Sequence, residues 1–156
     1  MTDHPPEGAP LGPILCAGTS LKIAARATGR LYDRALAPHD LNTMQYAILT
    51  NLARAGRMAS MALADRLSIE RTALYRALAV LERRGLVQAE PGRGRERILS
   101  LTPAGLELRT RAQADWAATQ EAFVAGFGPD WPAFQAMLAR ARALSDSLSD
   151  PEGDAA

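Results

Sequence analysis

Apolar side chains recur at every third or fourth position along most of the chain, which is the spacing that gathers them on one face of an α-helix. Helix-start signals support this pattern, because Asn42 followed by Gln45 resembles a capping box and Thr102 precedes Pro103. We therefore expect a chain built mainly of helices. The expected helices cover about residues 15–36, 42–55, 60–67, 70–84, 103–128 and 129–148.

The pattern changes between the fourth and the fifth of these helices. Residues 86–90 and 97–101 are short strand-like runs, and the six residues between them contain two glycines, a proline and two arginines. Such a segment is typical of an exposed loop that joins two antiparallel strands. The sequence therefore predicts a mainly α fold with a small β-hairpin wing, of the α+β class.

The fourth expected helix has an apolar face and a polar face. At about 100° per residue its leucines gather on one side. The other side, over the first two turns, carries Arg71, Thr72, Tyr75 and Arg76. Arginine can bond a guanine edge bidentately, and hydroxyl groups can reach bases or phosphates in a major groove. The alternative is an ordinary solvated helix face.

The expected hairpin loop is basic at its tip. Arg93, Arg95 and Arg97 alternate along it, so that Arg93 and Arg95 can reach outward to a minor groove and its flanking phosphates. The alternative is a turn whose charges only increase solubility. Two short helices followed by a hairpin with a basic tip are typical of a winged helix-turn-helix, which favours DNA binding for both motifs.

The charge along the chain is uneven although its net value is only +1. Residues 54–97 contain ten arginines and five carboxylates, a balance of +5, whereas residues 98–156 contain four arginines and eight carboxylates, a balance of −4. A basic segment within a frame that does not attract polyanions favours binding of a polyanion such as double-stranded DNA.

The chain has 156 residues, of which 47% are hydrophobic, and this fits one globular domain. Its ends, residues 1–13 and 149–156, contain prolines and acidic residues, and we expect flexible tails there. No apolar run approaches the ~20 residues of a membrane helix, and the N-terminus lacks the pattern of a signal peptide. A single cysteine excludes an internal disulfide. We therefore expect a soluble cytoplasmic protein without a membrane partner.

Two blocks of the sequence resemble the MarR-type transcription regulators (multiple antibiotic resistance regulators). Residues 67–87 are similar to the family's recognition-helix block, and residues 93–105 are similar to its wing signature. Arg95 matches the signature arginine, which in the family reaches into the minor groove, whereas Arg93 stands where the family has an aspartate. The resemblance covers about residues 16–105.

This resemblance implies a single MarR-like domain over residues 1–156, with a winged helix-turn-helix lobe at 40–102 and dimerisation helices at 14–37 and 103–148. It implies a homodimer on a palindromic operator, acting as a repressor that a small aromatic or phenolic effector or an oxidant releases. Apolar faces on the first and last helices favour the dimer independently, because a monomer would leave them exposed. The alternative from another class is a winged-helix protein-interaction module that does not read DNA.

Candidates for other chemistry are few. Cys16 is interpreted as a buried apolar residue, with a redox-active thiol as the alternative. His4 and His39 are the only histidines, and neither has the neighbours of a metal site. No phosphate-binding loop, nucleophile elbow or acid–base pair is recognisable. We therefore expect no enzyme activity, no cofactor and no metal, and the effector contacts stay unknown.

Overall fold

The structure is a computed structural model that describes residues 16–94 and 96–149. The expected tails lie outside this part of the chain, except for Ser149, which ends the last helix. The chain divides after Trp116 into two compact units, and one long helix continues from the first into the second. Within the described ranges, no helix is long and apolar enough to cross a membrane.

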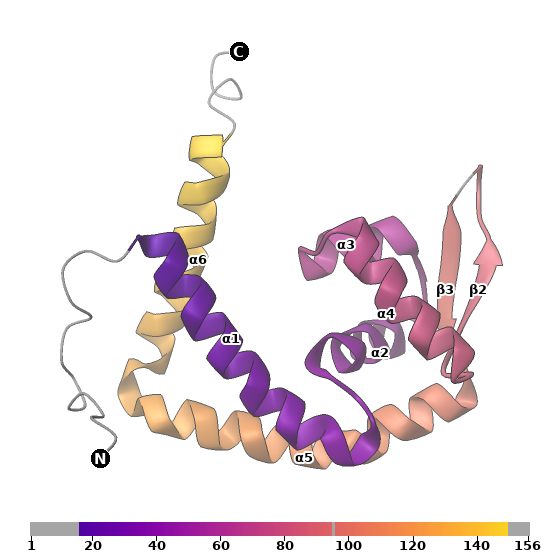
Figure 1. Ribbon diagram of the computed structural model, residues 1–156, viewed down its shortest axis with the longest axis horizontal. Helices are drawn as coiled ribbons and strands as arrows, with labels where there is room; N and C mark the ends of the chain where they lie inside the picture. The colour runs from indigo at the N-terminus through magenta and orange to yellow at the C-terminus, as the bar shows by residue number, and fades with distance from the viewer. Residues whose placement is uncertain (1–15, 95, 150–156) are drawn as a thin grey trace. The chain divides into compact units, whose positions relative to one another are not determined.

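The first unit consists of a long N-terminal helix and a helical lobe that carries a small sheet (Figure 1). Its elements are, in order, α1 (Ala17–Leu36), the 3-10 turn η1 (Ala37–His39), α2 (Thr43–Ala55), β1 (Arg57–Ala59), α3 (Ser60–Leu67), α4 (Arg71–Arg83), β2 (Val87–Pro91), β3 (Arg97–Leu101) and the first part of α5 (Pro103–Phe127). The second unit contains the rest of α5, the turn η2 (Gly128–Asp130) and α6 (Trp131–Ser149). The expected class, mainly helical with a small antiparallel sheet, is confirmed.

The sheet has three strands in the order β1-β3-β2, and both pairings are antiparallel. The predicted hairpin is the β2–β3 pair, in which Val87 lies opposite Leu101. Strand β1 was not expected from the sequence, because a strand of three residues is too short to show alternation. It pairs with the other edge of β3, where Met58 lies opposite Leu99, and so fixes the base of the hairpin against the lobe.

Helices α2, α3 and α4 enclose the core of the first unit together with β3. The large apolar side chains that lose all exposure to solvent are mostly leucines: Leu36, Ile48, Leu49, Leu52, Leu63, Leu74, Leu78, Leu81 and Leu99. Burial of each such side chain stabilises the fold by about 1.5–3 kcal/mol. The apolar face expected on α4 is therefore the face that holds this helix to the lobe.

Short capping contacts fix the ends of two helices. At α2 the Asn42 side chain accepts from the Gln45 backbone N–H, and the Gln45 side chain accepts from the Asn42 N–H, which confirms the capping box. At α5 the Thr102 hydroxyl accepts from the Gly105 N–H and donates to the Gly85 carbonyl at 2.7 Å. A Cβ atom on Gly105 would lie 2.0 Å from the Leu86 carbonyl oxygen, so glycine permits the close contact of α5 with the base of the hairpin.

The second unit is held by an aromatic cluster at the turn between α5 and α6. Phe127 stacks on Phe134 with ring centroids 4.5 Å apart, and its ring meets those of Phe123 and Trp131 edge to face. Beyond this cluster α6 has no buried residue. Met137 is 62% exposed and Leu148 is 73% exposed, so the part of the predicted apolar face that these residues form lies uncovered in the single chain.

Candidate nucleic-acid interface

Helix α4 presents the polar face that the sequence predicted. Arg71, Thr72 and Arg76 are exposed and Tyr75 is half-buried, while Leu74 and Leu78 on the other face have no exposed surface. Because the leucines hold the helix rigidly against the core, the outer face has a defined orientation. The first two turns of α4 therefore offer two guanidinium groups and a hydroxyl to a ligand outside the lobe.

The side chain of Tyr75 contacts Ser60 and Arg71. Its hydroxyl lies 3.4 Å from the Ser60 hydroxyl at the start of α3, and the Arg71 guanidinium carbon lies 5.5 Å from the centre of its ring. The hydrogen bond with Ser60 is the main cause that lowers the pKa of the Tyr75 phenol, and the neighbouring Arg71 lowers it further. Tyr75 thus differs from the freely exposed side chains beside it.

The hairpin loop after β2 closes through its own backbone. The Gly92 N–H donates to the Glu96 carbonyl at 2.9 Å, and Gly94 has a φ of 63°, a conformation that favours glycine. Arg93 is exposed at this tip. Arg95, the other arginine predicted to extend from the tip, lies outside the described residues.

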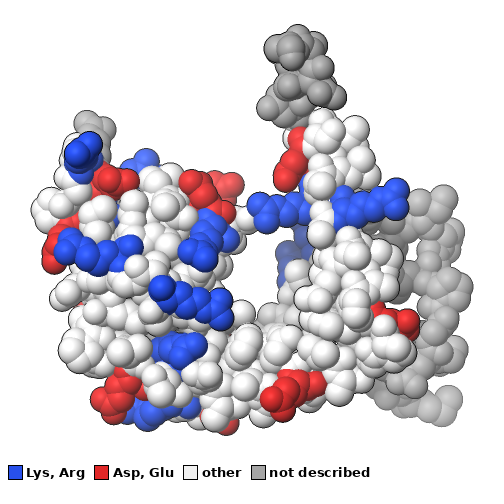
Figure 2. All heavy atoms as spheres, turned by 180° about the vertical axis from the view of Figure 1, so that it is seen from behind, with Lys and Arg blue, Asp and Glu red and all other residues white. Residues whose placement is uncertain are grey.

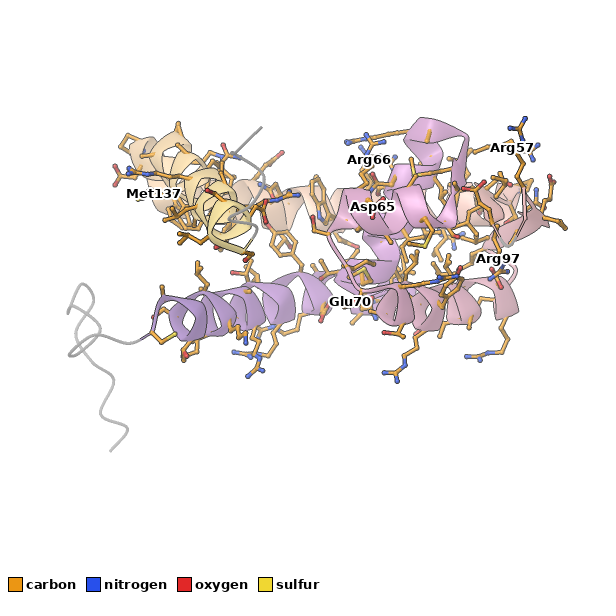
Figure 3. All side chains as sticks on the ribbon, turned by 90° about the horizontal axis from the view of Figure 1, so that it is seen from above. Arg57, Asp65, Arg66, Glu70, Arg97 and Met137 are labelled. Carbon is orange, nitrogen blue, oxygen red and sulfur yellow. The ribbon has the colours of Figure 1, made fainter. Side chains whose placement is uncertain are left out.

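Arg97 and Arg57 flank the sheet and each contacts a carboxylate. Arg97 on β3 donates to Glu82 on α4 at 2.8 Å, and its side chain is 38% exposed. Arg57 on β1 donates to Glu90 on β2 at 2.5 Å. In Figure 3 Arg97 lies close to α4, whereas Arg57 lies farther from this helix. The sequence does not single out Arg57, because a strand of three residues is too short to show alternation.

Basic side chains are distributed over the lobe rather than gathered at one point. Figure 2 shows lysine and arginine side chains spread over the first unit, with carboxylates between them. The alternation matches the ion pairs of the sheet, where two of the arginines already have carboxylate partners. On α4 and the hairpin, Arg71, Arg76 and Arg93 are exposed arginines that make no ion pair with a described carboxylate.

Contacts around the turn η1 connect the lobe to the long helices of the first unit. The Asp33 carboxylate on α1 accepts from both the backbone N–H and the hydroxyl of Thr43, at 2.7 and 2.6 Å. His39 lies 2.7 Å from Asp115 on α5. Arg84, just after α4, donates to the carbonyl oxygens of His39 and Asp40. The position of α4 is thereby coupled to the turn that links α1 with α2.

Cys16 is exposed at the start of α1, which contradicts its interpretation as a buried residue. A hydrogen bond from the Thr19 backbone is the main cause that lowers the pKa of the thiol, and the Gly18 backbone and the Thr19 hydroxyl add to this effect. His4, one of the two histidines, lies outside the described residues. Within residues 16–94 and 96–149, no three His, Cys, Asp or Glu side chains lie close enough to hold a metal ion.

Comparison with known proteins connects this geometry to one family. A model described as "MarR family" matches residues 39–98, and no curated protein matches the chain. The transcriptional regulator MosR of M. tuberculosis, solved in complex with DNA, is 32% identical with a TM-score of 0.78, over 86% of this chain and 98% of that chain. A second MosR structure is 31% identical with a TM-score of 0.76, over 85% of this chain and 96% of that chain.

A mutant of MarR from E. coli, complexed with operator DNA, is more distant. It is 21% identical with a TM-score of 0.69, and the match covers 79% of this chain and 90% of that chain. At this identity the likeness shows a shared fold and nothing further.

Proposed function

Because the chain belongs to the MarR family of transcription regulators, we propose that it binds a specific DNA sequence and regulates transcription there. The observation that carries this proposal is the exposed face of α4, where Arg71, Thr72 and Arg76 stand on a helix whose leucine face is buried. A rigid helix with guanidinium groups on its outer face suits insertion into a major groove. The 32% identity to MosR, a regulator solved on DNA, supports the same role.

The residues of α4 act in the major groove. Arg71 and Arg76 are the candidates for bidentate bonds to guanine, and Thr72 is the candidate for a hydroxyl contact with a base or a phosphate. Tyr75 lies on the same face beside Arg71. From here on α4 is called the recognition helix. Thr72 and Arg76, the second and sixth residues of this helix, lie about one turn apart, so their side chains follow the groove.

The hairpin is the wing. Arg93 at its exposed tip and Arg95 beside it contact the minor groove and the flanking phosphates, where positive charge attracts without reading sequence directly. Arg97 at the base of the wing donates to Glu82 and contributes its remaining N–H donors to a phosphate. The three wing arginines thus supply affinity, whereas the recognition helix supplies specificity.

The functional form is a homodimer on a palindromic operator. Leu21 and Ile23 on α1 are 45% and 56% exposed. Met137 and Leu148 on α6 are more exposed still, at 62% and 73%. A soluble chain seldom leaves so many large apolar side chains uncovered, and a two-fold dimer would bury them. The dimer would place two recognition helices about 34 Å apart, one turn of B-form DNA. It acts as a repressor that a small aromatic or phenolic effector or an oxidant releases.

A binding experiment with a randomised duplex library tests the proposal. The purified protein is expected to enrich one palindromic sequence, and the enriched duplex is expected to bind more weakly as salt rises. Arg71→Ala is expected to relax base preference, while Arg111→Ala, which changes an exposed arginine paired with Glu107, serves as the matched control. If no duplex is enriched even at low salt, the alternative of a protein-interaction module that does not read DNA replaces the proposal.

A further inference from the structure

We propose that Tyr75 is a positioning residue for Arg71: anchored by Ser60, its ring holds the Arg71 guanidinium in the orientation in which it reads a base pair. This inference rests on the proposed function and deepens it. It assigns to Tyr75 a role that acts through the side chain of Arg71. The helical wheel alone places Tyr75 beside Arg71 as a second residue that contacts DNA directly. Three steps lead to it.

The first step is the anchor between two helices. Ser60 is the first residue of α3 and has no exposed surface, and its hydroxyl lies within hydrogen-bond distance of the Tyr75 hydroxyl, at 3.4 Å. A buried hydroxyl needs a partner, because leaving it unpaired costs stability. Tyr75 therefore turns its phenol toward the lobe and is half-buried, whereas Arg71, Thr72 and Arg76 on the same face are exposed.

The second step is the contact of the anchored ring with Arg71. The two residues lie four positions apart, which puts them on adjacent turns of the same helix face. The Arg71 guanidinium carbon is 5.5 Å from the ring centre, within the ~6 Å range of a cation–π contact. The neighbouring Arg71 also helps to lower the pKa of the Tyr75 phenol. The guanidinium is thus held by a platform that is itself fixed to α3.

The third step is the effect of the fixed Arg71 guanidinium on base recognition. A free arginine side chain loses rotamer entropy when it binds, and a side chain already held in place loses less. Bidentate bonding to a guanine also depends on the orientation of the guanidinium plane. Within the described part of the chain, Arg76 has no hydrogen bond, ion pair or ring contact. The two arginines of the recognition helix therefore differ, and Arg76 is the natural comparison.

The test measures base preference as well as affinity. The probe is the duplex that the wild-type protein enriches from a randomised library, together with a panel of its single base-pair substitutions. Arg71→Ala is expected to lose about 5- to 150-fold of discrimination at one position. Tyr75→Leu is expected to relax preference at that same position and to leave the position read by Arg76 unchanged. Adding Tyr75→Leu to Arg71→Ala is expected to cause no further loss of preference.

Two conservative variants test the anchor. Tyr75→Phe and Ser60→Ala each remove one half of the 3.4 Å contact. Each is expected to reduce discrimination at the Arg71 position by about 2- to 10-fold, and the two together by no more than either alone. If a circular-dichroism melt shows that Tyr75→Leu does not fold, the combination of Tyr75→Phe with Ser60→Ala tests the positioning role instead. Full additivity of these two variants would then contradict that role. Preference ratios are used because a uniform loss of folded protein does not change them.

The outcomes distinguish a failure of the proposed function from a failure of the positioning role of Tyr75. If the wild-type protein enriches no duplex, the proposed function fails and this inference fails with it. If the wild type reads DNA and Arg71→Ala relaxes one position while Tyr75→Leu relaxes a different one, Tyr75 reads a base by itself and only the positioning role is wrong. The same conclusion follows if the effects of Tyr75→Leu and Arg71→Ala on preference add in full.

Discussion

Arg97 on strand β3 donates to Glu82 on the recognition helix at 2.8 Å, and this ion pair joins the base of the wing to α4. The Glu82 side chain is 28% exposed and that of Arg97 is 38% exposed, so the pair is only partly screened by water. The two elements that are proposed to contact DNA are thus fastened to each other as well as to the core.

Replacing Glu82 by Gln is expected to loosen the wing more than it destabilises the fold. A partly exposed pair is worth about 1 kcal/mol or less, so the melting temperature should fall by only a few degrees. DNA affinity is expected to fall severalfold, because the wing must then be ordered during binding. Glu107→Gln, which removes an exposed pair within α5, is the control and should change neither quantity. Equal effects of both variants on affinity would contradict a role of the Glu82–Arg97 pair in fixing the wing.

The contact between Gly105 and the Leu86 carbonyl predicts a large effect from a single methyl group. An added Cβ would lie 2.0 Å from that oxygen, so Gly105→Ala must displace α5 from the base of the wing. We expect a loss of about 2 kcal/mol or more in the free energy of unfolding, measured by urea denaturation.

Gly126 supplies the matched control for this substitution. It lies in the same helix, and a Cβ there would meet nothing within 4 Å. Gly126→Ala is therefore expected to stabilise the protein by about 0.5–1 kcal/mol, because alanine favours the helix more than glycine does. A comparable loss of stability in both variants would show that the close approach at Leu86 is not the cause.

The lowered pKa of the Cys16 thiol predicts a reactivity that depends on pH. Because the Thr19 and Gly18 backbone hydrogen bonds favour the thiolate, the exposed thiol should be alkylated faster at neutral pH than a cysteine in an unstructured peptide. The midpoint of the rate against pH should lie below the ordinary value for cysteine. Thr19→Val removes the hydroxyl contribution and should shift this midpoint upward. A midpoint equal to that of the peptide would exclude the effect.

A separate measurement decides whether this thiol senses oxidants. If Cys16 is the sensor, Cys16→Ser is expected to abolish the release of DNA by an oxidant and to leave DNA binding without oxidant unchanged. Oxidant-dependent release that persists in this variant would assign sensing to another group.

Local signals predicted most of the helices. The bounds of α3, residues 60–67, and of β3, residues 97–101, agree with the periodicity of the sequence. The buried leucine face of α4 and the capping box at Asn42 are also confirmed, because both depend on residues only three or four positions apart. Structure of this kind is encoded within a few turns of chain.

Contacts between distant elements could not be predicted in this way. Ser60 and Tyr75 are fifteen positions apart, as are Glu82 and Arg97, and both pairs form only when the elements pack together. Nothing in the sequence indicates exposure or a lowered pKa for the Cys16 thiol, yet Cys16 is exposed, and so are all of residues 21–27 of α1 in the single chain. Burial depends on what covers a helix, and the sequence of one chain does not show this.

Arg93, at the exposed tip of the wing, is expected to contribute to binding differently from Arg71. A phosphate contact releases counterions, so Arg93→Ala and Arg95→Ala should each reduce the slope of log affinity against log salt by about 0.9 per lost contact, with base preference unchanged. Arg71→Ala should instead relax base preference by about 1–3 kcal/mol. Fluorescence anisotropy with the enriched duplex between about 50 and 200 mM salt measures these slopes.

Arg111→Ala should keep the wild-type slope, since this exposed arginine lies on α5 and pairs with Glu107. If both wing variants keep that slope as well, the wing does not contact phosphates, and the affinity must come from the recognition helix alone.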